Sequence, residues 1–317
     1  MATLGIVTPA ARRTRTGNRV TALRWTKRLR ELGHRVFVAQ DWQGRGCDVL
    51  IAVHAHKSAA AVARFRAAHP DRPVLLLLAG TDIYPTFLPD APTLAALRSA
   101  TRLIALQPEA GVVVPVELRD RVRTIEQSAV VAACTRPDDV FGIITLAHLR
   151  SIKDPLRAAE ALRLLPGLRD LRVELVGKAL DADLAAAAAR LAAIEPRFSW
   201  PGELPRAAAM RALARSHLCV VPSLGEGGAN VVSEAIAAGT PLLASAIPGN
   251  TGLLGDDWPG LFPVGDTAAL AALIRRAREQ PPFRAALQQR TAALRPLVAP
   301  ARERELWRRL LAEVLPA

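Results

Sequence analysis

Aromatic and lysine side chains are scarce in this chain of 317 residues. It has five Trp, seven Phe and one Tyr, and lysine occurs only at positions 27, 57, 153 and 178. The formal net charge is nevertheless +13, because arginine supplies most of the basic side chains. Proteins that bind single-stranded nucleic acid stack bases on aromatic side chains, and the sequence has neither enough of these nor a basic low-complexity arm. We therefore expect the charge to serve anionic small substrates, with a nucleic-acid-binding protein as the weaker alternative.

Cysteine and long apolar runs are also scarce. Cys47, Cys134 and Cys219 have neither metal-ligand nor disulfide spacing, and no dense carboxylate cluster indicates a metal site. No apolar run reaches the roughly 18 residues that a membrane span needs. The first residues resemble a strand rather than a signal peptide. We expect a cytoplasmic protein with no membrane span and no metal, and the sequence leaves its oligomeric state open.

Apolar runs of strand length alternate with helical stretches along the whole chain, and half of the residues are apolar. Buried strands joined by helices predict parallel sheets. The length suits two α/β domains, each doubly wound and each binding ligands at the carboxyl ends of its strands. Expected strands are 4–8, 36–40, 49–54, 74–80, 103–107, 122–128, 142–148, 172–177, 198–202, 218–223, 241–245 and 260–264. Expected helices are 20–32, 58–69, 93–100, 155–165, 182–194, 206–215, 230–238, 267–279 and 301–314.

The most informative segment places two carboxylates, Glu226 and Glu234, on either side of a glycine pair. A strand-like run precedes the segment, and the helix-like run that follows stops at Gly239. Gly227 and Gly228 let the backbone approach a ligand closely, and the helix N-terminus attracts an anion. The pattern favours a site for the hydroxyls of a sugar and of a ribose on either side of a diphosphate. The weaker alternative is an ordinary strand–loop–helix corner.

A second loop, after the expected strand 142–148, carries Arg150 and Lys153 near a helix entrance. Such cations suit a diphosphate, although a solvated basic turn has the same composition. Farther along, the segment 245–252 ends another strand. Its Gly249 and Gly252 are expected to open space for a transferred sugar.

In the first half, candidate residues follow three of the expected strands. The loop after the first strand brings Arg12, Arg13 and Arg15 to a helix entrance at Gly17-Asn18. An exposed loop with incidental arginines is an equally good interpretation. The segments 54–57 and 80–82 end two further strands at the same predicted edge, and they contribute histidine, lysine and a Gly-Thr-Asp turn.

These residues resemble the GT4 type of glycosyltransferase. Glu226 to Glu234 matches that family's E-x7-E motif, and Lys153 matches its diphosphate-binding lysine. His148 stands where many members have arginine, so Arg150 is expected to supply the second cation. The resemblance is strongest over 142–265. It implies a GT-B fold: two Rossmann-like domains facing across a cleft, with 1–135 on the acceptor side, 139–297 binding the nucleotide sugar, and helix 300–317 crossing back.

A narrower resemblance is to the selenosugar synthases of selenoneine biosynthesis. It implies that a sugar passes from UDP-N-acetylglucosamine or UDP-glucose to selenophosphate, giving a 1-seleno sugar without a cofactor. An ordinary GT4 enzyme with a hydroxyl acceptor is the alternative, and it would need a general base and a larger apolar groove. The matching segments are 16–21, 54–58, 80–84, 106–107, 127–128, 148–155 and 226–234.

Taken together, the motifs and the resemblance give three sets of candidate residues. The catalytic set is Glu226, Lys153 and His56. The donor-binding set is His148, Arg150, Lys153, Glu226, Gly227, Gly228, Ala229, Asn230 and Glu234. The acceptor-binding set is Arg12, Arg13, Arg15, Gly17, Asn18, His54, Lys57, Gly80, Thr81 and Asp82.

Overall fold

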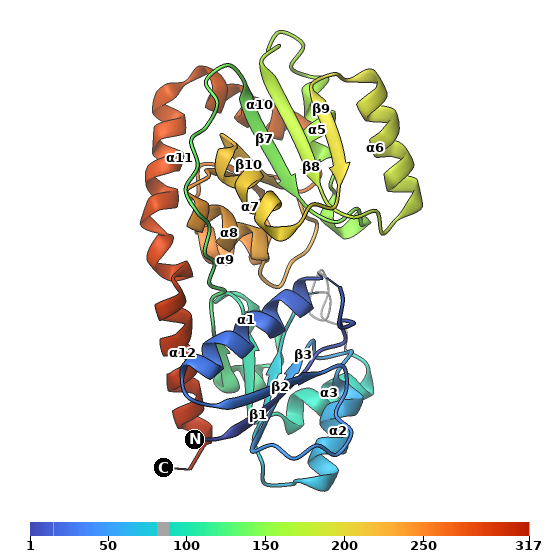
Figure 1. Ribbon diagram of the computed structural model, residues 1–317, viewed down its shortest axis with the longest axis vertical. Helices are drawn as coiled ribbons and strands as arrows, with labels where there is room; N and C mark the ends of the chain where they lie inside the picture. The colour runs from blue at the N-terminus through green and yellow to red at the C-terminus, as the bar shows by residue number, and fades with distance from the viewer. Residues whose placement is uncertain (15, 81–88, 317) are drawn as a thin grey trace. The chain divides into compact units, whose positions relative to one another are not determined.

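The computed structural model describes residues 1–14, 16–80 and 89–316, and they form two compact units (Figure 1). The first unit consists of Met1–Ser128, Glu226–Gly228 and Pro300–Ala317. The second consists of Ala129–Gly225 and Ala229–Ala299. Within the described ranges, no helix is both long enough and apolar enough to cross a membrane.

The first unit is built on a six-stranded parallel sheet with the strand order β2-β1-β3-β4-β5-β6. The order reverses between β1 and β3, since β2 lies on the far side of β1. Such a sheet has helices on both faces. The strands are β1 (Thr3–Val7), β2 (Arg35–Ala39), β3 (Val49–Val53), β4 (Val74–Leu77), β5 (Arg102–Ala105) and β6 (Val122–Thr124).

Side chains of these strands alternate between two buried clusters, as the twofold repeat of a strand requires. Ile6 and Ile51 join the cluster that contains Trp25 of α1 (Gly17–Glu31) and Trp307 of α12 (Pro300–Val314). Leu50 joins the opposite cluster, with residues of α2 (Ala59–Ala68), α3 (Ala91–Ser99), the single turn α4 (Ala110–Val113) and the short helix η1 (Val116–Arg121). Helices α1 and α12 therefore cover one face, and α2 and α3 cover the other.

Helix α12 is joined to the first unit by apolar and by polar contacts. The Trp25 and Trp307 rings meet edge to face with centroids 4.9 Å apart. Arg24 Nε lies 2.9 Å from Glu303 Oε1, and Glu303 is fully buried. The Ser128 hydroxyl donates to the other oxygen of Glu303. A buried carboxylate is stable only when it is paired and hydrogen-bonded in this way.

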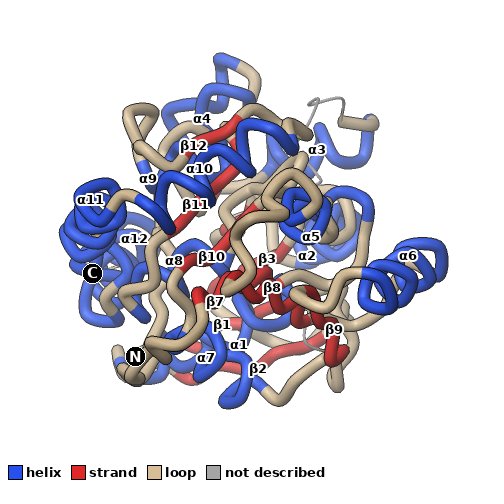
Figure 2. Tube along the Cα trace, turned by 90° about the horizontal axis from the view of Figure 1, so that it is seen from above, coloured by secondary structure: helices blue, strands red, loops and turns tan. Residues whose placement is uncertain are grey.

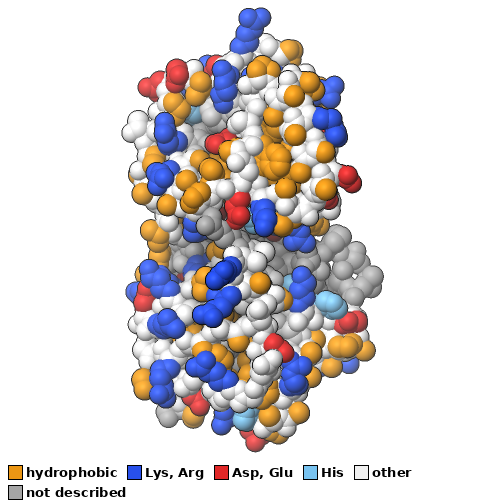
Figure 3. Space-filling view, turned by 45° about the vertical axis from the view of Figure 1, so that its right-hand side comes forward, with side chains coloured by type: hydrophobic (Ala, Val, Ile, Leu, Met, Phe, Trp, Pro, Cys, Tyr) orange, Lys and Arg blue, Asp and Glu red, His pale blue; other side chains and the backbone are white. Residues whose placement is uncertain are grey.

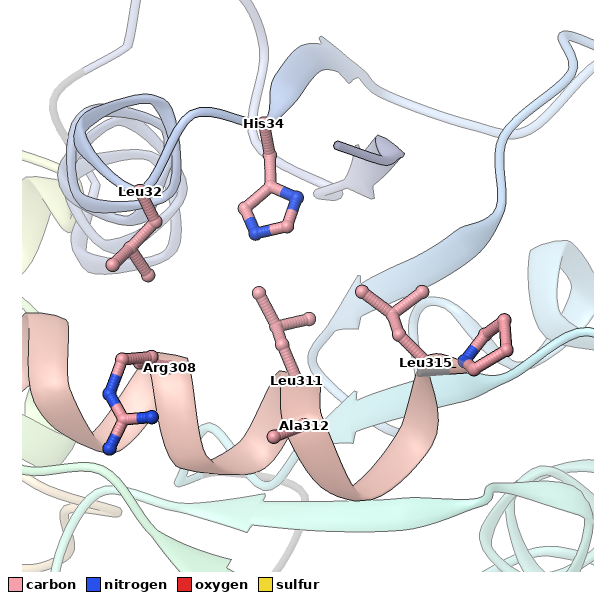
Figure 4. Close-up of a pocket in the computed structure, with 7 residues that line it drawn as sticks. Leu32, His34, Arg308, Leu311, Ala312 and Leu315 are labelled. Carbon is pink, nitrogen blue, oxygen red and sulfur yellow. The ribbon is translucent and has the colours of Figure 1, made fainter.

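A pocket of about 630 Å³ lies where the end of α1 faces the last turns of α12 (Figure 4). His34 in this pocket precedes β2, so the pocket lies at the amino ends of the strands, opposite the edge at which ligands bind in such sheets. Arg308, also in the lining, is paired with Glu305 at 2.7 Å. Burial lowers the pKa of the His34 ring, and the positive charge of the N-terminus lowers it further. The lining residues are Leu32, His34, Arg308, Leu311, Ala312, Leu315 and Pro316.

The second unit has its own six-stranded parallel sheet, with the order β12-β11-β10-β7-β8-β9. Its strands and helices share one continuous apolar core. Figure 2 shows α5 on one side of the row of strands and α7 and α8 on the other. The strands are β7 (Phe141–Leu146), β8 (Leu171–Val176), β9 (Phe198–Gly202), β10 (Leu218–Val221), β11 (Leu242–Ser245) and β12 (Leu261–Phe262). The helices are η2 (Ser151–Lys153), α5 (Arg157–Leu162), α6 (Ala182–Ile194), α7 (Arg206–Arg215), α8 (Asn230–Ala238), α9 (Pro248–Leu254), α10 (Thr267–Glu279), α11 (Pro281–Ala293) and η3 (Arg295–Val298).

The predicted fold class, two doubly wound parallel sheets, is confirmed by these two sheets and their helices. Three α-helices of the described residues were not predicted from the sequence pattern: the single turn α4, and the longer α9 and α11. Helices α9 and α11 begin with proline in the first turn, a position where the missing proline N–H has no helical partner to lose. Strand β6 stops at Thr124, although the prediction extended it to Ser128.

Candidate functional site

In the second unit, the strand order reverses between β7 and β10, and open α/β sheets bind ligands at the carboxyl ends of strands at such a point. The loop after β7 carries Arg150 and Lys153, and the loop after β10 leads to α8. These two loops meet, because the Leu224 N–H donates to the Ile152 carbonyl over 2.9 Å. The fold therefore brings the predicted diphosphate loop beside the start of the predicted carboxylate segment.

The loop after β7 contains the short 3₁₀ turn η2, which ends at Asp154 in the left-handed conformation with φ 44°. Lys153 is half-buried there and Arg150 is exposed. The His148 ring accepts a hydrogen bond through Nδ1 from the Lys178 N–H, over 3.0 Å. Three basic side chains thus lie along one loop at the carboxyl end of the sheet, as the sequence predicts. Whether they bind a diphosphate stays a prediction.

Glu234 lies in α8, the helix that follows the predicted loop. The helix begins at Asn230, after Ala229, and ends at Gly239 with φ 71°, which is the predicted stop. Glu234 is 8% exposed, and its Oε1 accepts a hydrogen bond from Arg206 Nη1 over 2.7 Å. Burial raises the pKa of the Cys219 thiol in β10, and the nearby Glu234 carboxylate raises it further. Glu234 is therefore an almost fully buried acid in the helix that follows β10.

Residues Glu226–Gly228 group with the first unit, and glycine is needed at both positions of the pair. A Cβ atom at Gly227 would lie 2.6 Å from the carbonyl carbon of Ala79, and one at Gly228 would lie 2.6 Å from Leu106 Cβ. Such distances are too short for any larger residue. This close packing accounts for the glycine pair without a ligand, so the predicted ligand contact of these two residues stays a prediction. Glu226 beside them is 9% exposed.

A third loop of the second unit, after β11, is joined to the loop after β10. The Ser245 hydroxyl donates to the Ser223 carbonyl over 2.6 Å, and Asn250 Nδ2 donates to the Ser245 carbonyl over 3.0 Å. Asn250 is fully buried in α9, and its Oδ1 has no hydrogen-bond partner among the described residues. Gly249 and Gly252 are both part of helix α9, and the space for a transferred sugar beside them stays a prediction.

In the first unit, the strand order reverses between β1 and β3. The loop after β1 holds Arg12 and Arg13, which are both exposed, and Gly17 and Asn18 begin helix α1 as predicted for a helix entrance. Arg15, Thr81 and Asp82 lie outside the residues that the structure describes. The described part of the predicted acceptor site thus lies where a doubly wound sheet binds its ligands.

The loop after β3 gives its histidines different surroundings. His54 is buried and has φ 79°, a conformation that non-glycine residues adopt rarely and that is found among the strained residues of active sites and ligand clamps. His56 is exposed, and its Nδ1 lies 3.0 Å from Thr93 Oγ1 and 3.4 Å from Asp90 Oδ2. Hydrogen bonds from Thr93, together with the His56 charge, lower the pKa of Asp90. Lys57, like His56, is exposed.

Gly80, the last predicted acceptor residue that the structure describes, follows β4 with φ 133°. A Cβ atom there would lie 2.7 Å from the Gly227 nitrogen. Only glycine meets both conditions. Backbone packing therefore explains why residue 80 is a glycine. A contact between Gly80 and an acceptor stays a prediction.

Neither the described side chains nor the face shown in Figure 3 has the features of a metal site or of a nucleic-acid surface. Among the residues with described positions, no group of three or more His, Cys, Asp or Glu side chains is placed to hold a metal ion. On the face shown in Figure 3, Lys and Arg side chains are scattered among uncharged and apolar ones rather than gathered into one stripe. Nucleic-acid-binding domains gather their basic side chains on one face.

Arg206 is a residue of this region that the sequence motifs did not indicate. It is the first residue of α7, the helix between β9 and β10, and it reaches Glu234 from there. The only signal available in the sequence was a basic residue at a predicted helix start, where acidic residues are preferred.

Comparisons with known proteins point to one family. The family described as Glycosyl transferases group 1 matches residues 131–293, more than half of the chain. No curated protein sequence matches the chain. Among solved structures, Alr3699/HepE from Anabaena in complex with UDP-glucose is similar, with a TM-score of 0.79, 16% identity and coverage of 99% of this chain and 100% of that one.

Two further structures are similar over the same length. Sucrose-phosphate synthase (tll1590) from Thermosynechococcus elongatus has a TM-score of 0.78 and 17% identity, covering 99% of this chain and 100% of its own. A glycosyltransferase from Rickettsia africae ESF-5 has a TM-score of 0.79 and 14% identity, covering 98% of each chain. At such identities the likeness establishes the fold, and this is the GT-B fold that the sequence predicts.

Proposed function

The chain belongs to the glycosyl transferases group 1 family, and from this premise we propose that it transfers a sugar from a UDP-sugar to selenophosphate, forming a 1-seleno sugar. The observation that carries the donor half is the meeting of the Lys153 loop and the β10–α8 segment at the switch point of the second unit. The Anabaena neighbour, of the same fold, was solved with UDP-glucose. UDP-glucose and UDP-N-acetylglucosamine are the donors to be tested.

For the donor we assign roles by the match to the E-x7-E motif. Glu234 accepts hydrogen bonds from the ribose hydroxyls, and Glu226 accepts them from the hydroxyls of the sugar. Lys153 and Arg150 contact the diphosphate, together with N–H groups at the start of α8, Ala229 and Asn230 among them. As UDP departs, negative charge grows on the β-phosphate, and cations placed there stabilise the transition state more than the ground state. No metal is needed for that step.

For the acceptor we assign the cations of the first unit, because selenophosphate is a small multiply charged anion with no apolar part. Arg12, Arg13 and Lys57 are exposed at the carboxyl ends of β1 and β3. Such an anion is held by charge-assisted hydrogen bonds and by backbone N–H groups, as at the entrance of α1. His56 is assigned to the same anion, since its ring nitrogens donate when protonated. We also propose the domain boundaries predicted above, 1–135 with 300–317, and 139–297.

The chemical step is a substitution at the anomeric carbon. A selenium lone pair forms the C1–Se bond, while the C1–O bond breaks and its electron pair leaves with UDP. The product still carries a phosphoryl group on selenium, and transfer of that group to water gives the 1-seleno sugar and inorganic phosphate. A selenium nucleophile needs little help from a general base, whereas a hydroxyl acceptor must lose a proton during attack.

The test is an assay of the purified protein with selenophosphate and a panel of UDP-sugars. UDP and phosphate release are followed together, and products are identified by mass spectrometry. We expect equal amounts of UDP and phosphate and a selenium-containing sugar. Glycosylation of an alcohol with no response to selenophosphate would replace the selenium acceptor by a hydroxyl acceptor. Binding of DNA without binding of UDP-sugar would overturn the glycosyltransferase function itself.

Replacement of Lys153 tests the donor half separately. Lys153→Ala removes a contact that strengthens in the transition state, and such losses lower the rate roughly a hundred-fold. Lys27→Ala is the matched control, because Lys27 is an exposed lysine on α1. If Lys153→Ala keeps the turnover of Lys27→Ala, the loop after β7 is not the phosphate site.

A further inference from the structure

Arg206 stands at a position where a helix does not favour a cation. It is the first residue of α7, no acidic residue occurs in that first turn, and the preceding Pro205 makes no side-chain cap. The N-terminus of a helix has a partial positive charge, so a basic side chain there is destabilising. Residues that break a local rule in this way are often kept for a role elsewhere in the molecule.

The contact that Arg206 makes is with the acid at the centre of the donor site. Arg206 Nη1 lies 2.7 Å from Glu234 Oε1, and the two side chains are 52% and 10% exposed, respectively. Glu234 is surrounded by buried neighbours in α8, and Cys219 below it is fully buried. A carboxylate in such surroundings tends to take up a proton unless a cation stabilises its charge. Arg206 supplies that charge from the edge of the sheet.

We propose that Arg206 is a positioning residue, which keeps Glu234 ionised and oriented so that it can accept both ribose hydroxyls of the donor. This inference rests on the assignment of Glu234 to the ribose made above. An ionised carboxylate accepts about four hydrogen bonds, so one from Arg206 and two from the ribose are within its capacity. A protonated Glu234 would accept fewer and would present a donor to hydroxyl groups that must donate.

Two other roles for Arg206 lead to different results. As a direct ligand of the diphosphate, it would contribute equally to nucleotides with and without ribose hydroxyls. As a simple link between α7 and α8, it would contribute to stability and not to nucleotide selectivity. The ribose hydroxyls are therefore the part of the ligand that separates the three roles.

The experiment compares the binding of UDP and of 2′,3′-dideoxyuridine diphosphate by calorimetry. Four proteins are used: wild type, Arg206→Ala, Arg206→Lys and the control Arg211→Ala, which removes an exposed arginine from the same helix. Hydrogen bonds to a charged acceptor give wild type a preference for UDP of roughly ten- to a hundred-fold. In Arg206→Ala we expect UDP affinity to fall about ten-fold while dideoxy affinity stays unchanged. Arg206→Lys should keep part of the preference for UDP over the dideoxy nucleotide, and Arg211→Ala should keep all of it.

Each other result overturns a defined part of the reasoning. If Arg206→Ala weakens the binding of both nucleotides equally, Arg206 is a diphosphate ligand. If the binding of both is unchanged, Arg206 is a structural link. Either result overturns the positioning role of Arg206 and leaves the proposed donor site in place. Equal affinity of wild type for both nucleotides overturns the ribose assignment of Glu234 and the inference with it. No binding of either nucleotide by wild type overturns the proposed donor. If Arg206→Ala fails to fold, Arg206→Lys still decides, since full loss of preference with lysine contradicts a role for charge.

Discussion

Replacing Glu303 with alanine should loosen α12 from the first unit. Glu303 is 0% exposed and its partner Arg24 is 13% exposed, with 2.9 Å between Nε and Oε1. The same carboxylate accepts a hydrogen bond from Ser128, and Arg24 also donates to Gln127 Oε1 over 2.5 Å. Removing one partner of a buried ion pair leaves the other charge without compensation, which lowers the free energy of unfolding by about 3–5 kcal/mol.

Much of that loss should come from the charge that Glu303→Ala leaves behind. Arg24→Ala combined with Glu303→Ala should therefore destabilise the protein by less than the sum of the single changes, with a coupling of about 0.5–3 kcal/mol. Denaturant unfolding gives the global value. Hydrogen exchange of the peptide that covers α12 shows whether the helix itself opens more often.

Glu305→Ala is the matched control, since Glu305 lies on the same helix and is paired with the exposed arginines Arg308 and Arg309. Those two arginines lower the pKa of Glu305 to about 2. We expect little change in stability or in exchange from this variant. If Glu303→Ala behaves like Glu305→Ala, the buried pair does not hold α12 in place.

Three further predictions concern the site and the pH dependence of stability. Glu234→Ala should weaken UDP binding itself, whereas Glu226→Ala should leave UDP affinity nearly unchanged and lower turnover; unchanged UDP affinity of Glu234→Ala in calorimetry contradicts the ribose role. Arg12→Ala and Lys57→Ala should each raise the KM for selenophosphate several-fold and leave that for UDP-sugar unchanged, and steady-state kinetics with the opposite pattern would move the acceptor site. Arginines of β5 and β6 lower the pKa of Glu313 in α12. The ionised Glu313 therefore stabilises the fold above the usual glutamate pKa of about 4.3, and this stabilisation is lost as the pH falls through the lower pKa of the folded protein. Glu313→Gln should make the loss of stability in acid smaller, as measured by unfolding curves at a series of pH values.

Much of the architecture could be predicted from the sequence, because buried parallel strands are short apolar runs bounded by polar residues. The runs at Leu218–Val221 and Leu242–Ser245 show this in the second unit. The predicted helix 230–238 has the observed bounds, since Gly239 ends it in a conformation that suits glycine. Helices α9 and α11 were missed because prolines and glycines in their first turns resemble a loop in a sequence pattern.

The prediction extended strand β6 through Ile125 to Ser128, whereas the strand ends at Thr124. The polar residues after Ile125 bond instead to side chains of distant helices. Gln127 accepts from Arg24 of α1, and Ser128 donates to Glu303 of α12. Sequence pattern shows local periodicity and does not show such long-range partners, and the contact between Arg206 and Glu234 was missed for the same reason.

Apart from the short segment Glu226–Gly228, the chain leaves the first unit after Ser128 and returns to it at Pro300. The two crossing segments run together, since the Ala129 N–H donates to the Val298 carbonyl over 3.1 Å. During synthesis, the second unit therefore emerges from the ribosome while the first still lacks α12. Until α12 has been synthesised, this helix does not pack on Trp25 and its apolar neighbours on that face of the sheet. The unit that begins to fold first is finished last, and a nascent chain stalled inside the second unit would present that bare face to chaperones.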